Sequence, residues 1–201
     1  MAGACSGAGT PANVSAVKWG GSGGTDLTQR GSTLNIGLFG KASQWSLVAP
    51  TAASQTLYAS WPSNQDETGL GGVSYTGVDQ TTPHGTQATA TNELAPTVNV
   101  TSAAGELVSD VVWHVNPVAD TTTITAGASQ TARVNIGSIG GAGFESLGMS
   151  EEAGSATVTM SWTIDGTTTD SGIIGIPIKP AAAGGSSIVP IVDKHYRHRR
   201  A

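Results

Sequence analysis

Few residue groups in this sequence have types and spacing suited to catalysis. Residues 20–24, Gly-Gly-Ser-Gly-Gly, match the G-x-S-x-G nucleophile elbow, which needs a strand before the serine and a helix after it. No helical pattern follows Ser22, and in a chain with 28 glycines such a match readily arises by chance. A loop is therefore the better interpretation. A catalytic triad would also need a positioned histidine and acid. Only His84, which we expect in a solvated loop, and His114, which we expect to be packed on an apolar strand, are available within the body of the chain.

Paired acidic residues are the second candidate for chemistry. Two facing carboxylates can act as acid and base in glycoside hydrolysis, and a loop of oxygens can hold calcium. The pairs are Asp66/Glu67, Glu151/Glu152 and Asp165/Asp170. The segment 165–170, DGTTTD, is the best calcium candidate, but it lacks the alternating ligands of an EF-hand loop. Solvated surface carboxylates are therefore the preferred interpretation, and we predict no metal site.

Aromatic side chains offer the remaining candidate, a binding site without catalysis. Trp45 and Trp61 would stack on sugars if they were exposed, although burial in a core is the commoner fate of tryptophan. With no catalytic residue identified, we predict a protein that is not an enzyme and needs no cofactor.

Composition and charge narrow the class further. Charged residues make up 11% of the chain, and no apolar run is long enough to cross a membrane. The formal net charge is -5. The body of the chain is acidic, and residues 191–201 hold four of the nine Lys and Arg residues, so binding of nucleic acid is not expected. The single cysteine, Cys5, excludes an internal disulfide, and the opening residues lack the basic and apolar regions of a secretory signal.

The body of the chain is typical of an all-β protein. Ten short runs rich in β-branched and aromatic residues recur between turn-forming clusters, a spacing that predicts an antiparallel β-sandwich. The runs are 14–19, 34–39, 44–48, 56–61, 70–76, 97–101, 107–115, 131–136, 156–164 and 172–179. Residues 156–164 alternate apolar and hydroxylated side chains, and the Asp165-Gly166 turn after them predicts a hairpin with the run 172–179. The continuously apolar run 107–115 is expected at the centre of a sheet.

Composition divides the chain into four parts. We expect a flexible leader at 1–12, a β-sandwich domain at 13–180, an Ala/Gly/Ser linker at 181–187 and an arm at 188–201 that is apolar and then basic. Such an arm is suited to docking on a neighbouring molecule. The residues predicted to bind a partner are Ile188, Val189, Ile191, Val192, Tyr196, Arg197, Arg199 and Arg200.

Residues 73–85, VSYTGVDQTTPHG, resemble a β-sandwich module that recurs in phage virion proteins and bacterial surface proteins. The segments 17–21, 45–50, 104–112 and 156–162 extend the resemblance over most of 13–180. It implies a jelly-roll-like or lectin-like sandwich and carries no catalytic residues. Such modules have an additional apolar strand before the segment matching 14–19, and we expect that strand to be missing here, with the leader in its place. We therefore expect a vacant sheet edge that the arm fills, in its own domain or on a neighbour.

The resemblance and the composition together lead to one functional expectation and one alternative. The first is a non-enzymatic virion structural protein, a capsid decoration or head-fibre protein. It would assemble in the host cytoplasm, form homo-oligomers and bind the major capsid protein or other virion subunits through its arm on the particle surface. The alternative is a carbohydrate-binding module that recognises cell-surface glycans.

Overall fold

The computed structural model is built from β-strands throughout the part of the chain that it describes, residues 1–7, 9–92, 94–116, 122–139, 145–165, 170–182 and 189–191. The strands are β1 (Ala2–Gly7), β2 (Ala16–Trp19), β3 (Thr25–Asp26), β4 (Thr28–Ile36), β5 (Gly40–Ser46), β6 (Leu57–Ser60), β7 (Glu67–Gly72), β8 (Ser74–Thr76), β9 (Ala88–Asn92), β10 (Thr97–Thr101), β11 (Leu107–Val115), β12 (Thr123–Ala126), β13 (Thr131–Ile139), β14 (Glu145–Ala153), β15 (Thr157–Asp165), β16 (Asp170–Ile178) and β17 (Val189–Ile191). All their pairings are antiparallel, which confirms the expected all-β class. No helix in these ranges is long and apolar enough to cross a membrane.

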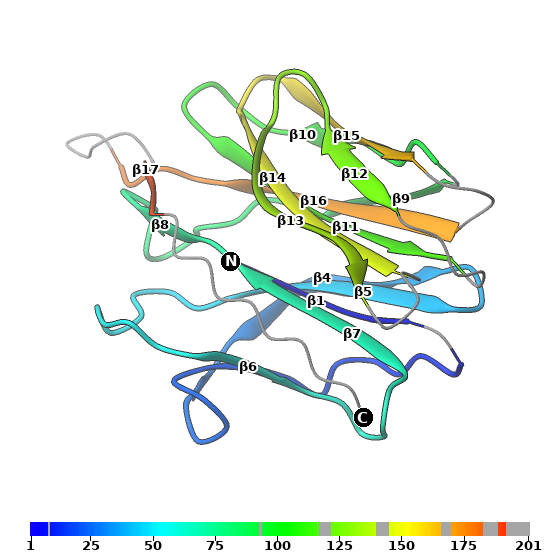
Figure 1. Ribbon diagram of the computed structural model, residues 1–201. Coiled ribbons are helices and arrows are strands. Elements are labelled where there is room, and N and C mark those ends of the chain that lie inside the picture. Colours follow the sequence, from blue (N-terminus) through cyan, green and yellow to red (C-terminus); the bar gives the residue numbers. More distant parts are fainter. Residues whose placement is uncertain are drawn as a thin grey trace.

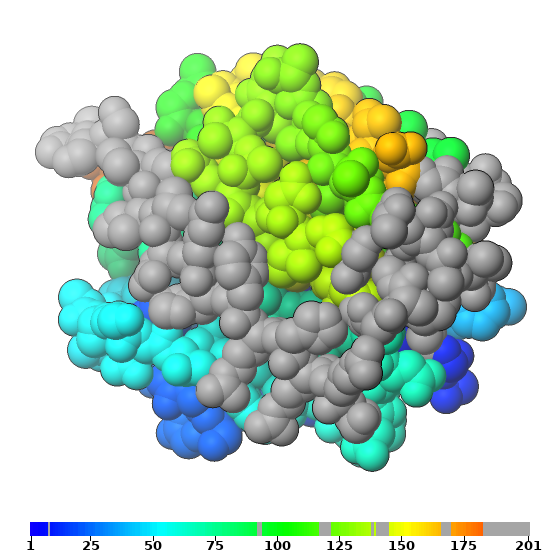
Figure 2. All heavy atoms as spheres, viewed as in Figure 1, coloured from blue at the N-terminus to red at the C-terminus, as the bar shows by residue number. Residues whose placement is uncertain are grey.

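The strands stack in four layers (Figure 1). The outer sheets are β3-β2-β6 and β10-β15-β12, the inner sheets are β4-β5-β1-β7 and β13-β14-β11-β16-β9, and β17 pairs separately with β8. An apolar core fills each space between successive layers. Figure 2 shows the atoms of β13, in lime, close above the cyan and teal atoms of residues 51–72. The sheets thus pack as a sandwich with additional outer layers.

Strand β11 lies at the centre of its sheet, as its continuous apolar run predicts. It pairs with β14 on one side and β16 on the other. Val111 and Trp113 point into the core between the two inner sheets, while Val112 points into the core beneath the β10-β15-β12 sheet. Because both faces are covered, every position of the strand after Leu107 is buried.

Strand β1 corrects the expectation of a flexible leader at 1–12. All six of its residues are buried, and it pairs with β5 and β7 in the middle of an inner sheet. Its small residues allow a close approach of the two inner sheets, since a Cβ added to Gly3 would lie 2.5 Å from Cγ2 of Val111. The strand that the resemblance suggested was missing is therefore present, built from small residues instead of large apolar ones.

The expected hairpin between residues 156–164 and 172–179 is wrong. Strand β15 pairs with β10 and β12, whereas β16 pairs with β11 and β9 in the neighbouring sheet. The alternating apolar residues of β15, among them Met160 and Trp162, pack on the inner sheet that contains β16. The chain therefore crosses from one layer to the next between Asp165 and Asp170, and residues 166–169 lie outside the described residues.

Candidate functional site

The C-terminal arm forms a strand where the structure describes it. β17 pairs antiparallel with β8, with Val189 opposite Thr76, Pro190 opposite Tyr75 and Ile191 opposite Ser74. Proline has no N–H to donate, so Pro190 restricts this segment to a sheet edge. The predicted arm residues outside the described ranges are Ile188, Val192, Tyr196, Arg197, Arg199 and Arg200. That the arm residues bind a partner stays a prediction.

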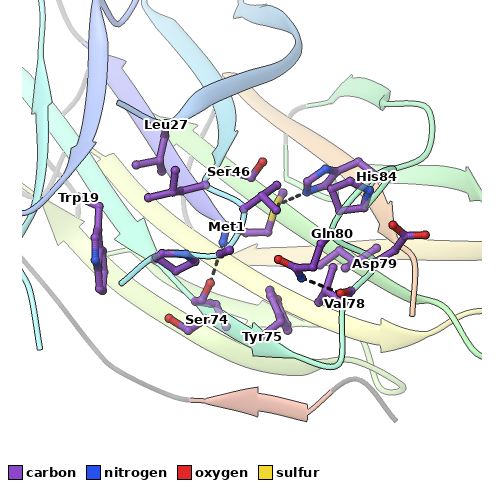
Figure 3. A pocket seen from close by; sticks show the side chains of 18 of the residues that line it. Met1, Trp19, Leu27, Ser46, Ser74, Tyr75, Val78, Asp79, Gln80 and His84 are labelled. Atoms are coloured by element: carbon purple, nitrogen blue, oxygen red, sulfur yellow. Dashed lines mark hydrogen bonds between the residues drawn. The ribbon is translucent and has the colours of Figure 1, made fainter. Parts of the chain in front are cut away.

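A pocket of about 160 Å³ lies beside β8 (Figure 3). Most of its walls come from three segments far apart in the sequence: Trp19 of β2, residues 46–50 at the end of β5 and after it, and residues between 72 and 84 from the end of β7 onward. Four further side chains complete the lining: Met1, Leu27, Leu57 and Ile178. All three segments belong to the motifs on which the resemblance rests. The structure thus brings those motifs together around one cavity.

The loop after β8 is held firmly in place. Asp79 Oδ1 accepts hydrogen bonds from the backbone N–H groups of Thr82 and Thr81, at 2.9 and 2.7 Å, and these bonds lower the pKa of the Asp79 carboxyl. Asp79 N donates to Lys179 O at 3.0 Å, and Lys179 N donates to Pro83 O at 2.9 Å. The "GVDQTTP" segment therefore forms a rigid wall, with its aspartate in a structural role.

His84 closes one end of this pocket. Its Nε2 lies 3.2 Å from Sδ of Met1, and burial lowers the pKa of its imidazole to about 4. The ring is neutral near pH 7, and its Nδ1 is buried with no hydrogen-bond partner in the described part of the chain. Those residues also include no carboxylate hydrogen-bonded to His84. Contrary to expectation, the side chain is thus half-buried instead of solvated, and the described residues do not supply it with the acid of a catalytic triad.

A second cavity, a groove of about 500 Å³, lies beside β6 and β7. Its described lining is uncharged and includes two aromatic residues, Tyr58 and Trp61. The indole Nε1 of Trp61 is buried and has no hydrogen-bond partner within the described ranges. Trp45, by contrast, belongs to the core, where its Nε1 donates to Oγ of Ser43 at 2.8 Å. Of the two tryptophans considered for sugar stacking, only Trp61 reaches a cavity.

An acidic cluster lies near the start of β7. Glu145 is fully buried, and neither of its carboxylate oxygens has a hydrogen-bond partner among the residues that the structure describes. Burial, together with the charges of Glu67 and Asp66, raises the pKa of Glu145 to about 8. Sequence reasoning singled out Asp66 and Glu67 but missed Glu145, which lies in a strand that no hydrophobic alternation marks.

The other sequence candidates lie apart from one another. Ser22 is exposed in a turn closed by a 3.1 Å bond from Gly24 N to Gly21 O, and β3 follows it instead of a helix. His114 is fully buried within β11, as expected. Glu151 is buried and forms an ion pair with Arg133, so the expectation of a solvated surface carboxylate is wrong for this residue. In the described ranges no three His, Cys, Asp or Glu side chains are grouped to hold a metal ion.

Comparison with known proteins gives no match, whether with protein-family models, with curated proteins or with solved structures. The functional proposal is therefore based on β8, on its partner strand β17 and on the two cavities described above.

Proposed function

We propose that this protein is a non-enzymatic structural protein of a virion, a capsid decoration or head-fibre protein held to neighbouring subunits by its C-terminal arm. The observation that supports this most is the pairing of β17 with β8. The same pairing made by the arm of another molecule would be recognition by strand addition, in which main-chain hydrogen bonds provide affinity and alternate side chains provide specificity.

Strand addition suits assembly because the same bonds can form within one chain or between two. The receiving strand β8 pairs with no other described strand, so the arm segment of a neighbouring molecule would find the same backbone groups there. The resemblance to virion modules, in its finer jelly-roll-like or lectin-like form, supports the same proposal, since three of its five segments contribute to the lining of the pocket beside β8. In this proposal the protein is a homo-oligomer, or it binds the major capsid protein.

Co-sedimentation with candidate phage capsids tests the proposal. We expect the full chain to bind in a fixed ratio and a chain ending at Ala182, which keeps the 2.8 Å bond from Ala181 N to Gly77 O, to lose binding. Two matched variants separate the halves of the arm. Val189→Asp with Ile191→Asp should abolish binding at all salt concentrations, whereas Arg197, Arg199 and Arg200 changed to alanine should weaken it mainly at low salt. Equal binding by the full and shortened chains would exclude the arm as the anchor.

A second candidate function is binding of neutral glycans, and the groove beside β6 favours it. Aromatic faces combined with uncharged hydrogen-bonding groups suit sugar rings, and the lining combines Tyr58 and Trp61 with serine, threonine, asparagine and glutamine. Titration with cellohexaose, maltohexaose and chitohexaose, followed by tryptophan fluorescence, tests it. Binding should be lost in Trp61→Ala and kept in Leu38→Ala, a control at an exposed apolar position far along the sequence. Unchanged fluorescence with all three sugars would remove this alternative for these ligands.

A further inference from the structure

We infer that the free edge of β7 receives residues 193–197 of the same chain, as a continuation of β17. β7 is the last strand of the sheet β4-β5-β1-β7, and on the side away from β1 it has no strand partner among the described residues. This inference goes beyond the proposed function, because it concerns the free protein and assigns an edge that the capsid argument does not use.

The hydrogen-bonding pattern of β7 shows which backbone groups face outward. Val73 exchanges two bonds with Met1, since Val73 N donates to Met1 O at 2.8 Å and Met1 N donates to Val73 O at 2.7 Å. In an antiparallel pair, residues alternate between bonding to one neighbour and bonding to the other. The N–H and C=O groups of Thr68, Leu70 and Gly72 therefore point away from β1, toward the free edge.

The arm approaches this edge in a matching register. β8 follows β7 after the single residue Val73, and β17 ends with Ile191 opposite Ser74. Pro190 lies opposite Tyr75. In this alternation the backbone N–H and C=O groups of Tyr75 point away from the arm, so the N–H that Pro190 lacks would have had no partner there. Continued without a bulge, the register sets Asp193 against Gly72, His195 against Leu70 and Arg197 against Thr68. All three of these arm residues can donate an N–H.

The groove and the charges at this edge fit the same occupant. Thr68 and Leu70 line the groove beside β6, so a strand added there would place its side chains in that cavity. Farther along β7 the same register brings His198 and Arg199 to Glu67 and Asp66, where the buried Glu145 has no hydrogen-bond partner in the described ranges. Residues 191–201 contain four Lys or Arg and one Asp, whereas the remainder of the chain is acidic. A basic segment is thus set against an acidic cluster.

The segment that we assign to this edge belongs to the same chain, because no additional residues are needed to connect β17 to the edge of β7. Ile191 already lies opposite Ser74, two residues from Gly72, so the next residues reach the free edge directly.

Engineered cysteines test the register. Residues that exchange hydrogen bonds across antiparallel strands have Cα atoms about 5.5 Å apart, within the range of a disulfide. We expect Thr68→Cys with Arg197→Cys to form an intramolecular disulfide at least tenfold faster than Thr68→Cys with His198→Cys, whose side chain would point to the opposite face. The native Cys5 is buried and does not compete. Equal rates for the two pairs, or products that are mainly disulfide-linked dimers, would overturn the inference.

Amide hydrogen exchange provides a second measurement on the unmodified chain. Peptides covering 66–72 should exchange at least tenfold more slowly in the full chain than in a chain ending at Ile191, while peptides from β11 exchange equally in both. Equal exchange of 66–72 would contradict the inference even if both proteins fold. Neither measurement includes capsids. A negative result in either would therefore overturn the assignment of the β7 edge without affecting the proposed function. Conversely, a failure to bind capsids would not affect the assignment of the β7 edge.

Discussion

The indole Nε1 of Trp162 donates a 2.8 Å hydrogen bond to Oδ2 of Asp110, joining the outer strand β15 to the central strand β11. Oδ1 of the same carboxyl accepts bonds from the N–H and the hydroxyl of Ser150, at 2.6 and 2.8 Å. Asp110 is completely buried, and its burial raises the pKa of the carboxyl to about 6. The Asp110 carboxylate thus links the two layers within their apolar core. Gln130 adds a second polar link, since its Nε2 donates to Oγ of Ser150 at 2.6 Å and its Oε1 accepts from N of Ser161 at 2.7 Å.

Trp162→Phe should lower the free energy of unfolding by about 2–3 kcal/mol, because it removes a hydrogen bond to a charged group. Trp45→Phe is the matched control. Its indole donates to the neutral hydroxyl of Ser43 at 2.8 Å, so its loss should be nearer about 1 kcal/mol. Urea denaturation of both variants at pH 7.5 measures the difference, and equal losses would mean that the carboxylate adds nothing.

Glu145→Gln should stabilise the protein increasingly as the pH rises. The pKa of Glu145 in the fold, about 8, lies above its ordinary value of 4.5. Its stabilising contribution is therefore complete below about pH 4.5 and is lost as the pH rises through about 8. The difference between the variant and the wild type should grow by about 1 kcal/mol per pH unit between pH 6 and 8.

Calorimetry of both proteins across this range checks the result for Glu145. The buried His84 contributes equally to both proteins and cancels in the difference. Leu38→Ala, which changes an exposed apolar side chain with no titratable group, should show a flat difference. A flat difference for Glu145→Gln as well would mean that Glu145 is hydrated in solution.

Gly69→Ala should cost about 3 kcal/mol, as expected when a core with no free space is overpacked. A Cβ at this position would lie 2.5 Å from Cζ3 of Trp113 on the facing sheet. Gly23→Ala provides the comparison, because a Cβ there meets nothing within 4 Å. If thermal unfolding showed similar losses for both, the close approach of the inner sheets would be in doubt.

Cys5 should resist alkylation by iodoacetamide in the native protein and react once the protein is unfolded in urea. It is fully buried in β1, and burial raises the pKa of its thiol well above the ordinary value. The reactive species is the thiolate, so both effects slow the reaction. Mass spectrometry follows the modification. Rapid labelling under native conditions would restore the interpretation of residues 1–12 as a flexible leader.

Ala49→Gly should raise the stability by about 0.5 kcal/mol. Ala49 has a φ of 47°, a left-handed conformation that costs a residue with a Cβ about 1 kcal/mol. Glycine removes this cost but gains chain entropy in the unfolded state, which offsets part of the benefit. Ala52→Gly, in the exposed loop that follows, should destabilise slightly. A loss of stability in both variants would show that the strain at Ala49 is not relieved by glycine.

The sequence predicted strands wherever side chains display a pattern. The alternation of Val158, Met160 and Trp162 identified β15, and the apolar run identified β11, because one buried face or two buried faces leave such a signature. β1 has no comparable signature. Gly3 is required by Val111 and Gly7 by Glu145, both on the facing sheet, and these partners lie more than 100 residues away in the sequence.

Local sequence patterns did not predict which strands pair with each other. Asp165-Gly166 favours a tight turn, but the apolar face of β15 and that of β16 cover each other from different layers, so pairing side by side was not required. In the candidate site, the arm was recognised from its composition. The groove and Glu145 were not, because uncharged lining residues and a single buried carboxyl have no sequence signature.

The central position of β1 affects how the chain folds. Its partners β5 and β7 lie 33 or more positions farther along, since Gly7 pairs with Gly40 and Ala2 with Gly72. The backbone groups of β1 are therefore satisfied on both sides only after residues 40–45 and 67–72 have been made. Closing such long loops before any contact is gained slows folding. We expect refolding to be limited by the insertion of β1 between β5 and β7, so that a chaperone would bind the unfolded chain at β1.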